Sequence, residues 1–188
     1  MPDAITYTNR VGRKYQLCEV TTKTGKRRYV FSREPTGKPL ETIPAGYEIS
    51  ESINGQVSLR KAGASPIQRE EIETVESALR CHEHLARYKV GAHRNAVVVF
   101  EPDRGVFDVC RELGVGPSDL EGLASRVRYS AVLRFVLVRE RPRRFVAERM
   151  CYRGSIDGWL SLHDVGSLSK LADRYLPHLG RDSFFELW

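Results

Sequence analysis

The sequence predicts an α+β fold in which antiparallel hairpins precede a mixed unit of helices and strands. The first 61 residues contain two runs of alternating apolar and polar residues, each broken by a turn that contains glycine. From residue 65 onward, helix and strand patterns both occur, but without the regular strand-helix alternation of a parallel sheet. We therefore expect a small antiparallel β unit over residues 1–61 and an α+β unit over residues 65–188, closely packed on the first.

The first hairpin is predicted from residues 14–34, KYQLCEVTTKTGKRRYVFSRE. Its large apolar residues share one face only if the loop has an odd number of residues, because side chains alternate along a strand. The loop Lys23-Thr24-Gly25 meets this condition, pairs Leu17 with Phe31 and gives Gly25 a left-handed conformation.

The second hairpin, YEISESINGQVSLRK, covers residues 47–61. A two-residue turn at Asn54-Gly55 would place Ile49 opposite Arg60. The three-residue loop Ile53-Asn54-Gly55 instead pairs Ile49 with Leu59 and restores one apolar face. The two hairpins together predict a four-stranded antiparallel sheet across residues 14–61.

A helix is predicted after the connector at residues 62–64. Ser65 suits the cap, Pro66 suits the first helical position, and Gln68 completes a capping box. Apolar spacing of three and four residues then predicts one buried stripe, formed by Ile72, Val75, Leu79, His82 and Ala86.

The same patterns predict the remaining elements. Residues 88–101 indicate one or two strands, and AVVVF within them is apolar on both faces, as in the centre of a sheet. Capping residues indicate short helices near residues 103–113 and 118–127. Residues 132–153, VLRFVLVRERPRRFVAERMCYR, indicate an arginine-rich hairpin. Residues 167–176 indicate a last helix that buries Leu168, Leu171, Ala172 and Tyr175.

Composition is that of a globular protein. The chain of 188 residues is 41% hydrophobic, which is enough for a sizeable core. The sequence shows neither a signal peptide nor a run of about 18 apolar residues, so we expect a cytoplasmic protein without a membrane span. The four cysteines are scattered without paired spacing, which favours reduced thiols over a disulfide frame: Cys18, Cys81, Cys110 and Cys151.

Positive charge is concentrated in two blocks of the chain. Residues 10–34 have a net charge of +6 and residues 126–153 have a net charge of +7, whereas the rest of the chain is acidic. If the two blocks fold side by side, they form a positive surface that attracts phosphate or an acidic partner.

Basic residues near the two hairpin turns are the candidate phosphate contacts. Guanidinium groups make paired hydrogen bonds to phosphate oxygens and keep their charge when partly desolvated. The sequence therefore predicts a protein that binds the backbone of RNA or DNA without sequence readout. Solvated surface charge and the arginine preference of a GC-rich genome are alternative explanations. The candidates are Lys23, Lys26, Arg27, Arg28, Arg139, Arg141, Arg143 and Arg144.

Two other function classes remain open. Common catalytic motifs are absent from the sequence, so we expect a binding protein without a cofactor rather than an enzyme. The enzymatic alternative is a metal-dependent phosphodiesterase, because Glu101 and Asp103 follow an apolar strand and Glu148 lies on the basic hairpin, where carboxylates could hold Mg²⁺ or Mn²⁺. A plain turn and helix cap explains the same carboxylates after the strand. The third alternative is a regulatory or scaffold protein with a protein partner.

Two further groups of residues contain the residue types of a metal site and of a hydrolase triad. Cys81 and His84 lie three residues apart on the predicted helix, so both could face one metal ion, although further ligands must come from elsewhere. The end of the chain holds the residue types of a hydrolase triad, Ser155, Asp157, His163, His178, Asp182 and Ser183. A capped final turn is the alternative, with apolar side chains docked on the core: Phe184, Phe185, Leu187 and Trp188.

Three runs of the sequence resemble a known family. GYEISESINGQVSLRK, RFVLVRERPRRFVAERMCYRGSIDGW and HLGRDSFFELW are similar to segments of a family of uncharacterised bacterial proteins that share a turn-rich N-terminal sheet and a DSFFEL-like tail. The resemblance covers most of the chain and implies a bacterial, cytoplasmic protein that forms a single folded unit. It implies no activity, because its shared positions are turn and core residues.

Overall fold

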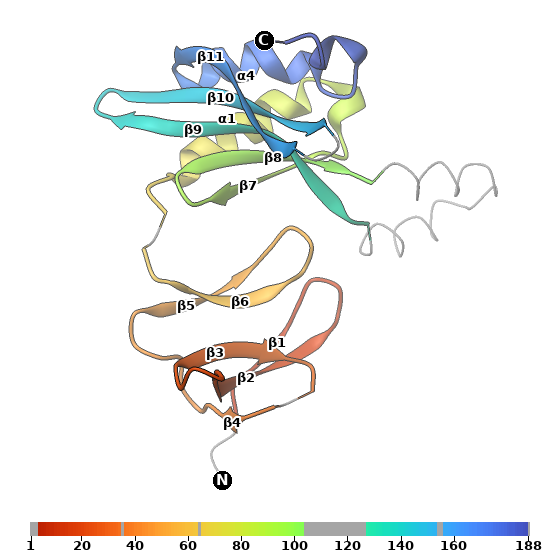
Figure 1. Cartoon of the computed structure of the whole chain (residues 1–188). Coiled ribbons are helices and arrows are strands. Elements are labelled where there is room, and N and C mark those ends of the chain that lie inside the picture. The colour runs from red at the N-terminus through yellow and green to blue at the C-terminus, as the bar shows by residue number, and fades with distance from the viewer. Residues whose placement is uncertain (1–3, 35, 64, 104–126, 154–155, 188) are drawn as a thin grey trace, which may run out of the picture. The chain divides into compact units, whose positions relative to one another are not determined.

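The computed structural model describes residues 4–34, 36–63, 65–103, 127–153 and 156–187 (Figure 1). Their contacts divide the chain into two compact units, one formed by residues 4–63 and the other by residues 65–103 and 128–187. Both units contain antiparallel sheets, and the second also contains helices, which confirms the α+β class. Within these ranges, no helix is long and apolar enough to span a membrane.

The first unit contains a four-stranded antiparallel sheet whose central strand is β2. Strand β2 pairs with β1 and β4 along one side and with β3 along the other. The predicted register is confirmed, because Leu17 lies opposite Phe31 and the Thr22 amide donates to the Lys26 carbonyl across the loop, at 2.8 Å. Gly25 has the expected left-handed φ of +77°. The strands are β1 (Thr6–Thr8), β2 (Lys14–Thr21), β3 (Arg27–Ser32) and β4 (Lys38–Pro39).

The second hairpin forms a two-stranded sheet of its own, from β5 (Tyr47–Glu51) and β6 (Val57–Lys61). Its register is also as predicted: Ile49 lies opposite Leu59, and Gly55 has a φ of +74°. An N-terminal four-stranded sheet is therefore present, but β1 and β4 complete it in place of the second hairpin. These two strands are too short to show an alternating pattern in the sequence.

Side chains of β1 and the turn after it attach the second hairpin to the first sheet. Buried Asn9 donates from Nδ2 to the Gly55 carbonyl at 2.6 Å, and the Tyr7 hydroxyl donates to Glu51 at 3.0 Å. The Tyr29 and Tyr47 rings meet edge to face, with centroids 5.7 Å apart. The small unit is thus held together by polar and aromatic contacts around a modest core.

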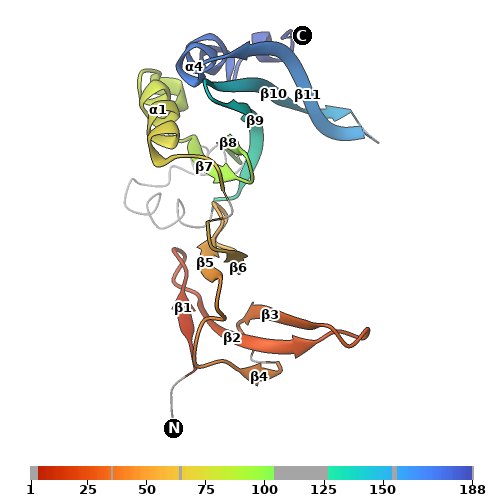
Figure 2. The same ribbon diagram turned by 90° about the vertical axis from the view of Figure 1, so that its left-hand side faces the viewer.

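The second unit is a five-stranded antiparallel sheet covered on one face by two helices (Figure 2). Helix α1 (Arg69–Arg80) packs against β7 and β8, and α4 (Leu168–Tyr175) packs against β10 and β11. The strand order is β11-β10-β9-β8-β7. The strands are β7 (Lys89–His93), β8 (Ala96–Pro102), β9 (Tyr129–Glu140), β10 (Arg143–Arg153) and β11 (Ile156–Gly166).

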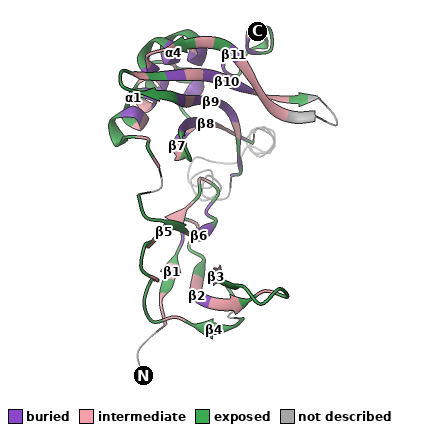
Figure 3. Ribbon diagram, turned by 60° about the vertical axis from the view of Figure 1, so that its left-hand side comes forward, coloured by how far each residue is buried: buried purple, intermediate pink, exposed green. Residues whose placement is uncertain are grey.

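The main core lies between this sheet and its helices, where buried residues concentrate (Figure 3). Alternate residues of the central strands, such as Val97, Val99 and Phe135, face Val75 and Leu79 of α1 within one apolar cluster. All four residues predicted to be buried on α4 are buried. The opposite face of the sheet has no helix among the described residues.

Helix α1 is shorter than the sequence predicts at both ends. Its N-cap is Gln68, whose backbone N–H donates to the Glu71 carboxylate at 2.9 Å. The capping box therefore lies three residues later than expected. The helix ends at Arg80, and a short 3-10 helix, η1 (Glu83–Leu85), follows. Leu85 is buried there, and the expected stripe positions His82 and Ala86 are not on the helix.

A buried arginine anchors the C-terminal segment, which contains η2 (Leu176–His178) and η3 (Asp182–Phe184). Arg149 of β10 is 3% exposed and donates to the carbonyls of Phe185 and Leu187. Phe184 is buried and Leu187 packs on the core, but the Phe185 ring is 64% exposed, which corrects the prediction that it docks there. The helices expected near residues 104–126 fall outside the described residues.

Candidate functional site

The tip of the β9–β10 hairpin concentrates exposed arginines. Arg139 at the end of β9 lies directly opposite Arg144 at the start of β10, and Arg141 occupies the turn between them. All three are exposed, and within the described ranges none has a carboxylate at ion-pair distance. Like charges directly opposite each other on neighbouring strands are destabilising. This tip therefore keeps an electrostatic cost that a bound anion would relieve.

Arg143, the fourth candidate on this hairpin, has a different position. Side chains alternate along β10, so Arg143 lies on the helix side of the sheet and Arg144 on the other side. Its guanidinium group makes a two-pronged contact with Glu71 of α1, at 2.5 and 2.8 Å, and also donates to the Pro66 carbonyl at 3.0 Å. The Glu71 carboxylate thus neutralises Arg143 and ties the hairpin to the helix.

The first hairpin presents its candidates on the β2–β3 loop and the adjoining end of β3. Lys23, Lys26, Arg27 and Arg28 are all exposed. Arg27 approaches Glu19 at 3.4 Å while its side chain stays 77% exposed, which is a weak surface pair. The other three have no acidic partner among the residues that the structure describes. The two cationic hairpin ends belong to different units of the chain.

Glu148 pairs with an arginine instead of joining the other candidate carboxylates. It lies opposite Arg134 on β9, and its Oε2 accepts from Arg134 Nε at 2.6 Å. The Arg134 guanidinium also stacks on the Trp159 ring of β11, 4.3 Å from its centroid. Local sequence patterns do not indicate the contact between Arg134 and Trp159, because β9 and β11 are neither consecutive in the sequence nor neighbours in the sheet.

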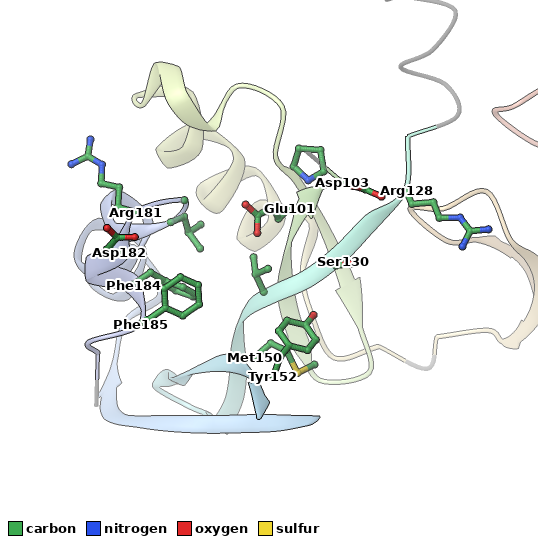
Figure 4. A pocket seen from close by; sticks show the side chains of 14 residues that line it. Glu101, Asp103, Arg128, Ser130, Met150, Tyr152, Arg181, Asp182, Phe184 and Phe185 are labelled. Carbon is green, nitrogen blue, oxygen red and sulfur yellow. The ribbon is translucent and has the colours of Figure 1, made fainter. Parts of the chain in front are cut away.

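Glu101 and Asp103 line one cavity of about 500 Å³ (Figure 4). Glu101 faces the C-terminal segment that carries Arg181, Asp182 and Phe184. Its carboxylate accepts a hydrogen bond from the Tyr88 hydroxyl at 2.8 Å. Among the residues with described positions, no group of three or more His, Cys, Asp or Glu side chains could hold a metal ion. Both carboxylates thus line one cavity, in which Asp103 points toward Arg128 and away from Glu101, and Glu148 is not part of its lining (Figure 4).

Cys81 and His84 do not share a helix, because α1 ends before both. The Cys81 thiol is exposed and donates to the Ser77 carbonyl at 3.5 Å. The His84 ring meets the His82 ring edge to face, 5.8 Å apart. Loss of hydration, followed by the positive charge of Arg181, lowers the pKa of His84. Cys81 thus contacts the end of α1 and His84 contacts His82, so the two side chains do not lie on one helix face as the predicted metal site requires.

The triad residue types of the chain end are only partly close to one another. His178 Nδ1 and Ser183 Oγ share a hydrogen bond of 2.9 Å, which links η2 to η3 over five residues. His163 lies on β11 with a left-handed φ of +56°. Ser155 lies outside the described residues, as do the side-chain contacts of Asp157. The observed pair closes the local turn between the two 3-10 helices.

Comparison of the chain with models of known protein families, with curated proteins and with solved structures finds no match. The resemblance to a bacterial family therefore stays a prediction.

Proposed function

We propose that this protein binds the phosphate backbone of nucleic acid through its cationic hairpin ends, without reading base sequence. The observation that carries the proposal is the direct opposition of Arg139 and Arg144, with Arg141 beside them in the turn. Glu140 also lies at this tip, but among the described residues neither Arg139 nor Arg144 forms an ion pair with it or with another carboxylate. Solubility alone does not require two guanidinium groups opposed in this way.

The structure narrows the set of proposed contacts. Arg143 is taken up by Glu71, so Arg139, Arg141 and Arg144 are the proposed contacts of the second unit. Lys23, Lys26 and Arg28 provide the equivalent set in the first unit, with Arg27 partly compensated by Glu19.

Backbone binding has a characteristic dependence on salt concentration, because each neutralised phosphate releases counterions. We would measure the dissociation constant of a fluorescein-labelled single strand by anisotropy over a range of salt concentrations. Replacing Arg139, Arg141 and Arg144 together by Gln should reduce the magnitude of the log-log slope by about 2. Binding of different sequences should weaken equally.

The matched control removes an exposed arginine elsewhere in the same unit. Arg69→Gln changes the charge on α1, where the side chain is 87% exposed and pairs with Glu73. Its salt slope should equal that of the wild type. If the triple variant keeps the wild-type slope, or if the wild type does not bind the strand even at low salt, the proposal is refuted.

A further inference from the structure

The face of the β7–β11 sheet opposite the helices contains a hollow of about 620 Å³. This volume lies within the range of about 300–1,000 Å³ that small-ligand pockets occupy. Neighbouring residues of the same strands, including Val97, Val99 and Phe135, face the helices and belong to the core. The floor is apolar and partly aromatic: Ala96, Val98, Phe100, Val136, Met150 and Trp159.

Contacts hold the aromatic part of this hollow in place. Arg134 is fixed between the Glu148 carboxylate, at 2.6 Å from Nε, and the Trp159 ring, at 4.3 Å from its centroid. The guanidinium group therefore lies over the face of the indole ring, and both line the hollow. Planar surfaces with π-electrons accept flat aromatic ligands, and every nucleobase has such a face.

The rim of the hollow supplies polar and cationic groups. His93 ends β7, and Arg94 and Asn95 form the β7–β8 turn, where exposed Arg94 has a left-handed φ of +53°. Asn95 Nδ2 donates to the Leu137 carbonyl at 3.3 Å, which connects this turn to β9. These polar side chains can form hydrogen bonds with the edge of a bound base, and they do not select one type of base.

The strand register links the hollow to the arginine tip. Val146 lies opposite Val136 in the hollow, and Arg144 follows two residues away on β10, on the same face. Two residues of an extended strand span about 7 Å. The stacking pair lies farther from the tip, because Arg134 is opposite Glu148, four residues and about 13 Å from Arg144 along β10. A nucleic-acid strand whose base stacks there can carry a nearby phosphate to Arg144.

We infer that this hollow binds an unpaired base of single-stranded nucleic acid, stacked at the Arg134–Trp159 pair, while the adjoining backbone contacts the arginine tip. The inference rests on the proposed function, and it adds the class of ligand. A duplex keeps its bases inside the stack and cannot fill the hollow, so single strands are preferred. Stacking also explains tolerance to sequence, because it uses the base face and not a particular edge.

The experiment compares three labelled oligonucleotides of equal length: a thymine single strand, an abasic single strand and a duplex. Each is titrated against the whole protein by fluorescence anisotropy at fixed salt. Base stacking typically contributes enough to change affinity by about 5- to 150-fold per base. We expect the thymine strand to bind more tightly than the abasic strand by a factor in this range.

Variants then assign that preference to the hollow. Trp159→Leu and, separately, Phe100→Leu should remove most of the preference for the thymine strand and leave binding of the abasic strand unchanged. Phe185→Leu is the matched control, since this exposed ring lies outside the hollow, and it should keep the preference. Circular dichroism of each variant confirms folding, and either folded variant suffices for the test.

Two outcomes overturn the inference while leaving backbone binding intact. One is equal affinity for the thymine and abasic strands, and the other is equal affinity for the duplex and the thymine strand. A preference for the thymine strand that survives in folded Trp159→Leu and Phe100→Leu likewise overturns the inference, because the base is then bound outside the hollow. Absence of binding to every oligonucleotide at low salt refutes the proposed function as well as the inference.

Discussion

The contact between Arg143 and Glu71 predicts a large loss of stability in Arg143→Met. Glu71 is 8% exposed and would lose two charge-assisted hydrogen bonds, and the Pro66 carbonyl would lose a third. Removing one partner of a buried ion pair typically costs about 3–5 kcal/mol. Because the Arg143 side chain is 26% exposed, water can replace part of the lost contact. We therefore expect the free energy of unfolding to fall by about 2–4 kcal/mol.

Urea unfolding followed by tryptophan fluorescence measures this change, since Trp159 belongs to the same unit. Arg69→Met is the control, because it removes another Arg–Glu pair of α1 that is exposed, and it should cost less than about 0.5 kcal/mol. In a Glu71→Gln background, which keeps a capping side chain, Arg143→Met should cost clearly less than in the wild type. If Arg143→Met and Arg69→Met lower the free energy of unfolding equally, the contact between Arg143 and Glu71 does not anchor the hairpin.

Three further predictions test other parts of the structure. Arg149→Met should destabilise by about 2–4 kcal/mol, because the carbonyls of Phe185 and Leu187 lose the charged donor of a buried side chain. Carboxypeptidase should then trim the C-terminal segment faster, and an unchanged rate contradicts the anchor. Gly37→Ala should destabilise more than Gly12→Ala, since both have positive φ but only the Gly37 Cβ would overlap a backbone oxygen, that of the Glu19 carbonyl, at 2.4 Å; equal unfolding midpoints would argue against that overlap. Burial, followed by a hydrogen bond to Asp164, raises the pKa of Tyr175 to about 12, so its stabilising contribution is present below pH 10 and is lost between about pH 10 and 12. In an ultraviolet titration, Asp164→Asn should lower this pKa, and an unchanged value would contradict the contact.

Hairpin registers could be predicted from the sequence because the information is local. The parity of Leu17 and Phe31 and the position of Gly25 are enough to choose a three-residue loop, and the structure has that loop. The same reasoning found the second loop despite its Asn-Gly pair.

The helix start was wrong because two capping boxes overlap in the sequence. Ser65 with Gln68 and Gln68 with Glu71 both satisfy the local pattern. The structure uses the second, in which Glu71 also binds Arg143, 72 residues away. Local spacing contains no information about that partner. The same limit hid the contact between Arg134 and Trp159, which depends on the order of three strands.

Two neighbouring residues of β10 have separate roles: Arg143 attaches the hairpin to α1, and Arg144 contributes to the charge of the tip. Arg143 fastens the ribbon to α1 from one side, and Arg144 projects from the other side. The charge of the tip can therefore be reversed without loss of the fold. Acidic residues at positions 139, 141 and 144 would make the tip attract cations in place of anions, while the contact between Arg143 and Glu71 is kept. Ligand preference at this end of the sheet can thus diversify without a new fold.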